Sequence, residues 1–238
     1  MNTNNTSQHI SHKFDEEMEN LRNKVLKMGG LVEQQISGAI EALQNTDAKV
    51  ADRIILRDHK VNALEVLIDE ACTQILARRQ PAATDLRMVV AVIKTITDLE
   101  RIGDEAEKIA KMALNLADND VSFNQQYAGI RHLGEQVQRM VHDVLDAYAR
   151  LDVDAATKVI RDDEEADKEY QDLIRMLITY MMEDPRTISE VLDVIWAARA
   201  LERIGDHAKN IGEYVIYLVK GKDIRHLDLD EVEKDILS

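Results

Sequence analysis

The chain has 238 residues, of which only 9 are Gly and 2 are Pro, and aromatic residues make up 4%. So few turn-favouring residues, with 32% charged residues and a single cysteine, indicate long helices and exclude a disulfide scaffold or a β-sandwich. The formal net charge of −15 disfavours binding to nucleic acid or to anionic membranes. No apolar run approaches the roughly 20 residues that span a bilayer, so we expect a soluble cytoplasmic protein with no membrane insertion.

Six long helices are predicted along the chain. Apolar residues recur with a 3.6-residue period, and turn-favouring residues separate the periodic stretches at Asn45-Thr46-Asp47, Gln80-Pro81 and Asp184-Pro185. Gly221 is expected to end the last helix. The predicted ranges are 14–45, from the Asp47 cap to about 79, 84–117, 122–151, 153–183 and 186–220.

The chain contains an internal repeat. The sequence Leu-Glu-Arg-Ile-Gly-Asp at residues 99–104 recurs at 201–206, an offset of 102, and an upstream offset of 105 pairs Gly29 with Gly134 and Asp58 with Asp163. Each copy holds three predicted helices joined by short connections, which favour antiparallel neighbours. The sequence therefore predicts an all-α fold of two tandem three-helix bundles, over 14–118 and 122–221, with tails at 1–13 and 222–238.

Carboxylates interrupt the apolar stripes at matching positions in both copies. Glu100 and Asp104 lie four residues apart on one helix face, as do Glu202 and Asp206, and they continue a core-facing stripe. In the preceding helix of each copy, a second pair of polar residues interrupts the apolar seam. We expect two oxygen-rich clusters, one formed by Asp58, Asn62, Glu100 and Asp104 and the other by Asp163, Asp167, Glu202 and Asp206.

Carboxylate and amide oxygens are hard ligands, so these clusters favour Mg²⁺, Mn²⁺ or iron over soft metals. Three alternatives remain at this point. The core face can rotate along the helix and leave Glu100 and Asp104 in solvent, where Arg101 can pair with them. Arg203 can pair with the acids of the second copy in the same way. A structural helical scaffold explains the periodicity but not the duplicated acids. A carboxylate-bridged di-metal enzyme is disfavoured because the chain has no Glu-x-x-His motif.

The repeated Glu-Arg-Ile-Gly-Asp motif, Arg79-Gln80-Pro81 and the segment His207-Ala208-Lys209-Asn210-Ile211 resemble the PhoU family of phosphate-uptake regulators. The resemblance implies two similar three-helix bundles that bind metal ions, divalent or trivalent, through acidic helical motifs. Four positions carry over directly from the motif, and three follow less directly. The four are Glu100, Asp104, Glu202 and Asp206, and the three are Asp58, Asp163 and Asp167.

The resemblance also implies a regulatory and non-enzymatic function. Family members restrain phosphate uptake and phosphate-starvation signalling by linking the ATPase component of a Pst-type phosphate ABC transporter to a PhoR-type sensor histidine kinase. A homodimer is expected, since dimers are the commonest homo-oligomers. Asn210 is assigned to the second metal site, whereas the first copy has Lys108 there and Asn62 in place of an aspartate. We therefore predict that the second site binds metal more strongly.

Overall fold

The computed structural model describes residues 3–79, 81, 83–119, 128–225 and 227, and its description of side chains begins at Phe14. All of its regular elements are helices, and none is long and apolar enough to cross a membrane within this part of the chain. The first half contains α1 (Thr3–Asn45), α2 (Ala48–Arg57), α3 (His59–Arg79) and α4 (Ala83–Asp118). The second half contains α5 (Ala128–Arg150), α6 (Val153–Glu183), the 3₁₀ turn η2 (Pro185–Thr187) and α7 (Ile188–Lys220).

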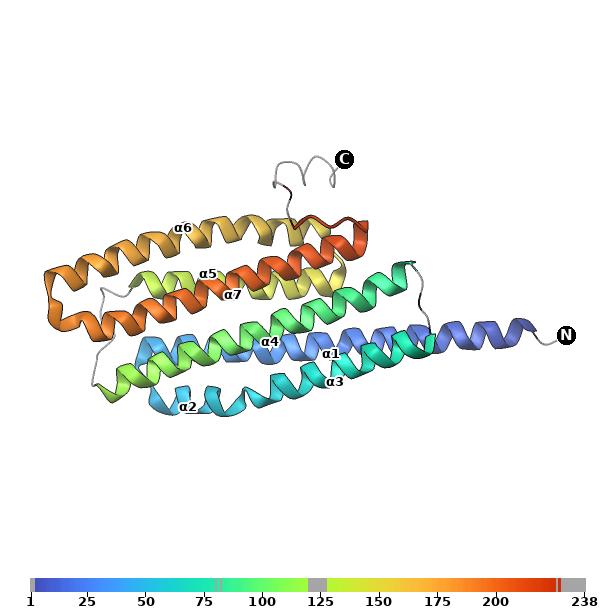
Figure 1. Ribbon diagram of the computed structural model, residues 1–238, viewed down its shortest axis with the longest axis horizontal. Helices are drawn as coiled ribbons and strands as arrows, with labels where there is room; N and C mark the ends of the chain where they lie inside the picture. The colour runs from blue at the N-terminus through green and yellow to red at the C-terminus, as the bar shows by residue number, and fades with distance from the viewer. Residues whose placement is uncertain (1–2, 80, 82, 120–127, 226, 228–238) are drawn as a thin grey trace.

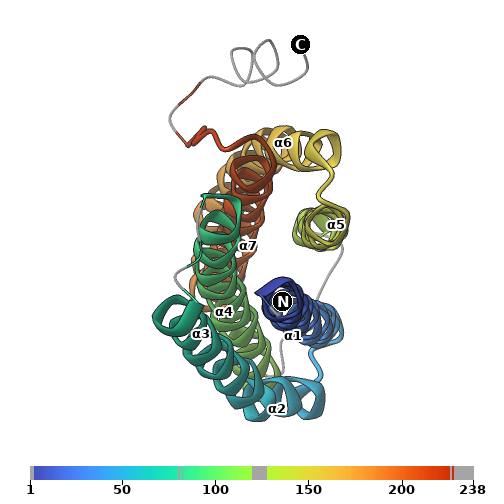
Figure 2. The same ribbon diagram turned by 90° about the vertical axis from the view of Figure 1, so that its right-hand side faces the viewer.

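Each half is an up-down-up bundle, and the two halves lie side by side (Figure 1). Viewed along the helices, α6, α7, α4 and α3 form one layer, while α5, α1 and α2 form the other (Figure 2). The two halves meet where α4 packs on α7 and where α1 packs on α5. This arrangement confirms the predicted fold of two repeated three-helix bundles.

Aspartate caps begin the second helix of each half at equivalent positions. The Asp47 carboxylate accepts hydrogen bonds from the backbone N–H groups of Lys49 and Val50, and Asp152 accepts one from Ala155. These bonds satisfy N–H groups that have no partner inside the first turn. At the other end of the chain, Gly221 has a φ of 72° directly after α7, the left-handed conformation that favours glycine at a helix end.

The second helix of the first half was predicted as one element, and this is wrong at Asp58. The helix is interrupted there, between α2 and α3, and the Asp58 carbonyl accepts from Val61 N at 2.9 Å and from Asn62 N at 3.4 Å. The interruption contains neither Pro nor Gly, and it coincides with the position at which the Gln35 side chain of α1 donates to the Asp58 carboxylate. The residue equivalent to Gln35 is Met140, which offers no such donor to Asp163, and α6 is continuous.

The predicted boundaries at the two ends of the chain also change. Helix α1 begins at Thr3, so the tail expected over 1–13 is helical for most of its length. That segment contains neither Pro nor Gly, and extending an existing helix costs far less than starting one. The start predicted at residue 122, and most of the tail predicted over 222–238, lie outside the described residues.

Small residues let α1 and α5 approach each other closely. A Cβ at Gly29 would lie 2.6 Å from Leu145 Cδ2, and a Cβ at Gly134 would lie 3.2 Å from Ile40 Cδ1. The repeat offset of 105 relates Gly29 to Gly134 and Ile40 to Leu145. The contact is therefore reciprocal, with a glycine of each helix receiving the branched side chain of the other. It relates the two halves by an approximate two-fold axis.

Candidate metal centres

The first acidic cluster lies where the interruption between α2 and α3 faces α4. Asp58 is buried there, and its two carboxylate oxygens accept hydrogen bonds from Gln35 Nε2 at 3.1 Å and from Asn62 Nδ2 at 3.0 Å. Glu100 and Asp104 project from α4 and are partly buried. Gly103 lies between them in sequence, and a Cβ at this position would lie 3.4 Å from Asp58 Oδ1, so glycine leaves room for that carboxylate.

The second acidic cluster occupies the equivalent place between α6 and α7. Asp163 is buried, and its Oδ2 accepts a hydrogen bond from Lys209 Nζ at 2.9 Å. Glu202 Oε1 accepts from Arg199 Nη1 at 2.5 Å, while Asp167 and Asp206 are partly exposed. A Cβ at Gly205 would lie 3.4 Å from Asp163 Oδ1, the same relation as at Gly103.

Burial and mutual repulsion raise the pKa of carboxyl groups in the first cluster. Burial is the main cause at Glu100, followed by the charge of Asp104, and at Asp104 burial is followed by the charge of Asp58. The pKa of Glu65, one turn beyond Asn62 on α3, is also raised by burial and by the charge of Asp69. Like charges thus lie close together in a partly desolvated place, which favours binding of protons or cations.

The second cluster shows the same electrostatics. Burial raises the pKa of Glu202 to about 6, with Asp206 as the second cause. Burial also raises the pKa of Asp163 and Asp167, although Lys209 opposes this at both groups. Carboxyl groups with raised pKa values gathered at one place are candidates for function.

Three buried oxygens in these clusters have no hydrogen-bond partner among the described residues. They are Gln35 Oε1 and Asn62 Oδ1 in the first cluster and Glu202 Oε2 in the second. An unsatisfied buried acceptor costs about 1–3 kcal/mol, and a bound cation would satisfy it. The donor set of carboxylate and amide oxygens fits a hard metal ion such as Mg²⁺ or Mn²⁺.

As the side chains lie, no three Asp, Glu, His or Cys groups of the described residues are placed to hold one metal ion. Binding would therefore require side-chain rotation, which is available to Glu100, Asp104, Asp167 and Asp206 because they are partly exposed. In each half, the two helices that carry the cluster bring their acidic residues close together. The structure thus places Asp58, Asn62, Glu100 and Asp104 in the first cluster and Asp163, Asp167, Glu202 and Asp206 in the second, without forming a coordination shell.

The placement of Asn210 in the second metal site is wrong. Its side chain points from α7 toward α4, where Nδ2 donates to Asp98 Oδ1 at 3.1 Å. His207 joins the same contact, with Nδ1 2.7 Å from Asp98 Oδ1. Asp206, which is also one turn away from Asn210, acts instead on Asp163 and Asp167 of α6 and raises the pKa of both carboxyl groups. The partly buried contact of Asn210 and His207 with Asp98 belongs to the interface between the halves.

One of the two reasons for expecting a weaker first site concerns Lys108, whose direct partner lies outside the acidic cluster. Lys108 Nζ bonds Glu105 Oε1 at 2.9 Å, and it acts on Asp104 only through space, lowering the pKa of that carboxyl. Glu105 is 3% exposed and also accepts from Arg203 Nε at 2.8 Å, again across the α4–α7 interface. The ammonium group that enters an acidic cluster is Lys209, in the second half. The relative affinity of the two sites stays a prediction.

The arginines expected to pair with exposed acids behave differently in the two halves. Arg101 Nε lies 3.7 Å from Glu100 Oε2, a contact that the solvent-exposed alternative anticipates. Arg203 instead pairs with Glu105, and Arg199 is the partner of Glu202. The side chains of Glu100 and Glu202 are only 21% and 11% exposed, so the structure does not turn both acids into solvent.

Comparison with known proteins gives consistent matches over almost the whole chain. Residues 25–113 and 130–215 match the model of the PhoU domain. The chain is 48% identical over 238 residues to the phosphate-specific transport system accessory protein PhoU of Escherichia coli strain K12, covering 98% of this chain and 96% of that protein. Its identity to the corresponding Pseudomonas aeruginosa homologue is 49% over 236 residues, covering 99% and 97%.

Solved structures agree. The crystal structure of PhoU from Pseudomonas aeruginosa superposes with a TM-score of 0.85 at 52% identity, covering 88% of this chain and 100% of that one. The phosphate transport system regulatory protein PhoU from Streptococcus pneumoniae gives a TM-score of 0.81 at 31% identity, covering 88% and 98%. With both repeats matched and near-full-length identity to these proteins, the chain belongs to the PhoU family.

Proposed function

We propose that this protein is a metal-binding regulatory adaptor of phosphate uptake. It restrains uptake and phosphate-starvation signalling by coupling the ATPase component of a Pst-type phosphate ABC transporter to a PhoR-type sensor histidine kinase in the cytoplasm. The observation that carries this proposal is the near-full-length identity to proteins named as accessory proteins of the phosphate-specific transport system. The proposal requires no catalytic step.

Metal binding is assigned to the two acidic clusters. Asp58, Asn62, Glu100 and Asp104 would hold one site, and Asp163, Asp167, Glu202 and Asp206 the other. A bound Mg²⁺, Mn²⁺ or iron ion would supply positive charge against the repelling carboxylates. The unpaired oxygens of Gln35, Asn62 and Glu202 support this assignment, because they accept no hydrogen bond within the described part of the chain.

An exposed apolar surface on α6 and α7 supports the adaptor role. Trp196 is 62% exposed, and Leu192 and Ile188 lie four and eight residues earlier on α7, both also exposed. Ile178 and Met182 of the neighbouring helix α6 expose their side chains near the same helix ends. Apolar side chains gathered on a surface mark sites of protein interaction, and Trp is enriched among residues that dominate binding energy.

Co-purification with the transporter ATPase and with the kinase, from cells in high and in low phosphate, tests the proposal. We expect both partners to be recovered with the protein in high phosphate, and elemental analysis of the same samples to find bound metal. Trp196→Ser should weaken recovery of at least one partner, whereas Leu56→Ser, which alters an equally exposed apolar residue on α2, should leave both unchanged. Recovery of neither partner under either condition contradicts the adaptor role.

Metal assignment is tested with paired variants. Glu100→Gln/Asp104→Asn and Glu202→Gln/Asp206→Asn each remove two carboxylates from one cluster. We expect each variant to lose about half of the bound Mn²⁺ in equilibrium dialysis, and the affinity that remains in each shows which site is stronger. Metal content unchanged in both variants contradicts the assignment. Sedimentation velocity tests the expected homodimer.

A further inference from the structure

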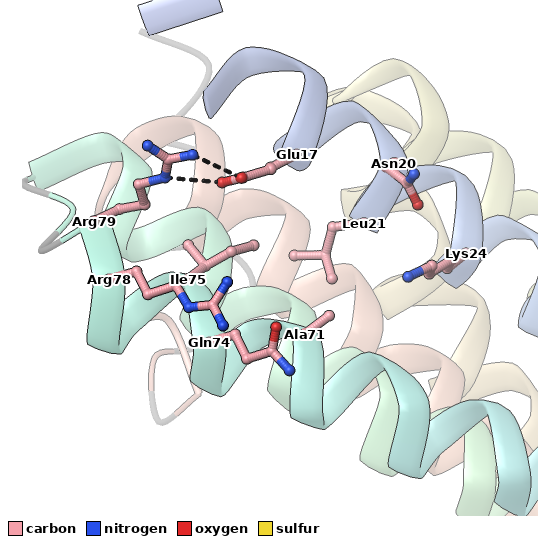
Figure 3. Close-up of a pocket in the computed structure, with 9 residues that line it drawn as sticks. All are labelled: Glu17, Asn20, Leu21, Lys24, Ala71, Gln74, Ile75, Arg78 and Arg79. Carbon is pink, nitrogen blue, oxygen red and sulfur yellow. Dashed lines mark hydrogen bonds and ion pairs between the residues drawn. The ribbon is translucent and has the colours of Figure 1, made fainter. Parts of the chain in front are cut away.

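A pocket outside the acidic clusters opens between α1 and α3, near the end of the first bundle (Figure 3). Its volume is about 200 Å³. The apolar side chains of Leu21 and Ile75 lie between polar groups of both helices, and Lys24 and Arg78 reach toward the opening from opposite helices (Figure 3). The pocket thus combines an apolar floor with a cationic rim, in a chain whose net charge is −15.

Only one cation of this rim is paired with an acid. Arg79 donates from Nε and Nη2 to the two carboxylate oxygens of Glu17, at 3.1 and 2.7 Å. Lys24 and Arg78 have no hydrogen-bond or ion-pair partner among the described residues. Two positive side chains without a direct acid partner therefore lie on facing sides of one small pocket.

The cationic rim is not a by-product of the repeated architecture. The register is fixed nearby by the pair Cys72 and Leu177, which are 105 residues apart and both fully buried. At the same offset Lys24 corresponds to Gly129, while Arg78 and Arg79 correspond to Glu183 and Asp184. The second half thus keeps the bundle but has acids in place of the two arginines and glycine in place of the lysine, so the rim is specific to the first half.

The chemistry of the rim defines the ligand. Arginine and lysine are the side chains that proteins use for phosphate oxygens, and Asn20 and Gln74 add amide donors at the edge of the pocket. A phosphate group carries about −1.5 to −2 charges at neutral pH, which matches two cations that lack a direct acid partner, whereas a single carboxylate would leave one unpaired.

We propose that this pocket between α1 and α3 is a phosphate-binding site, in which Lys24 and Arg78 contact the phosphate oxygens. The ligand is inorganic phosphate or a phosphate monoester whose organic part contacts Leu21 and Ile75. The site lies apart from the acidic clusters and the exposed apolar surface, so it can fail without affecting the adaptor role.

Isothermal titration calorimetry with the full chain in EDTA tests the site, because the chelator removes metal ions that would bind phosphate themselves. The probes are inorganic phosphate, phenyl phosphate and sulfate, at about pH 7 and constant ionic strength. Binding of inorganic phosphate identifies the free ion, and binding of phenyl phosphate alone identifies a monoester. Either result supports the site, whereas binding of neither overturns it, and sulfate binding equal to that of both phosphates overturns its selectivity for phosphate.

Variants separate a local site from a general effect of charge. Lys24→Gln/Arg78→Gln should weaken phosphate binding at least tenfold. Arg131→Gln/Lys168→Gln removes the same charge from exposed positions on α5 and α6 and should leave binding unchanged. Equal loss in the two double variants overturns the proposal, as does full binding by the first. Circular dichroism confirms that both variants fold, and Glu202→Gln should bind phosphate like the unaltered chain.

Discussion

Replacement of Glu202 by glutamine examines the electrostatics of the second acidic cluster. The Glu202 side chain is 11% exposed, and one of its oxygens has no partner among the described residues. Burial and the charge of Asp206 raise its pKa from 4.5 to about 6. Because the folded-state pKa lies above the unfolded one, the ionised carboxylate destabilises the fold above about pH 6, and this cost disappears as the pH falls toward 4.5.

A shift from 4.5 to about 6 corresponds to about 2 kcal/mol, at roughly 1.36 kcal/mol per pH unit. In metal-free buffer at about pH 7.5, Glu202→Gln should therefore raise the free energy of unfolding by up to about 2 kcal/mol, a value that already includes the opposing charge of Arg199. For a chain of this length the gain corresponds to about 4–8 °C in Tm. At about pH 4 the variant and the unaltered chain should be equally stable.

Thermal unfolding followed by far-ultraviolet circular dichroism measures this difference at both pH values, with and without Mn²⁺. Glu183→Gln serves as the control, since Glu183 is exposed on the same pair of helices and should change neither curve. Added Mn²⁺ should stabilise the unaltered chain more than Glu202→Gln. If the variant is less stable than the unaltered chain in metal-free buffer at about pH 7.5, or gains as much stability at about pH 4, the electrostatic reasoning is refuted.

Three further substitutions test the packing and the polar contacts of the fold. Asp152→Ala removes a helix cap and should cost about 1 kcal/mol of unfolding free energy in urea denaturation, and no loss would contradict the cap. Gly29→Ala places a Cβ 2.6 Å from Leu145 Cδ2 and should cost about 1–3 kcal/mol of unfolding free energy. In a double-mutant cycle, Leu145→Ala should partly restore this loss, and purely additive losses would contradict the contact. Arg203→Met removes a donor from buried Glu105 and should cost about 1–3 kcal/mol by the same measurement, whereas a neutral result would mean that the contact contributes little to stability.

The sequence predicted the architecture well because the decisive signals are local or repeated. The 3.6-residue period and the Asp47 and Asp152 caps identify helices without knowledge of their neighbours, and α6 begins and ends where the pattern does. The repeat also brought the same polar positions together in both halves. The sequence does not show toward which of two neighbouring helices each polar side chain points.

The misplacement of Asn210 illustrates that limit. A residue of α7 can face α6 or α4, and only the packing of α4 on α7 assigns Asn210 and His207 to Asp98. Asp98 and Glu105 were missed for the same reason, since a buried acid resembles a surface acid until its cross-helix partner is known. The repeat did not reveal these acids either, because the residues at the equivalent positions of the second half are not acidic. Asp98 corresponds to Ala200, and Glu105 corresponds to His207.

The polar and charged contacts between α4 and α7 affect which halves associate with each other during folding. The α1–α5 contact is reciprocal, so two copies of the first half alone would be able to form it with one another. The position of His207 corresponds to Glu105 in the first half, so such a mispaired assembly would bring Asp98 of one copy opposite Glu105 of the other. That assembly would lack the contact between Asp98 and His207, which forms only when the first half meets the second, so the correct union keeps a cross-helix contact that self-association loses.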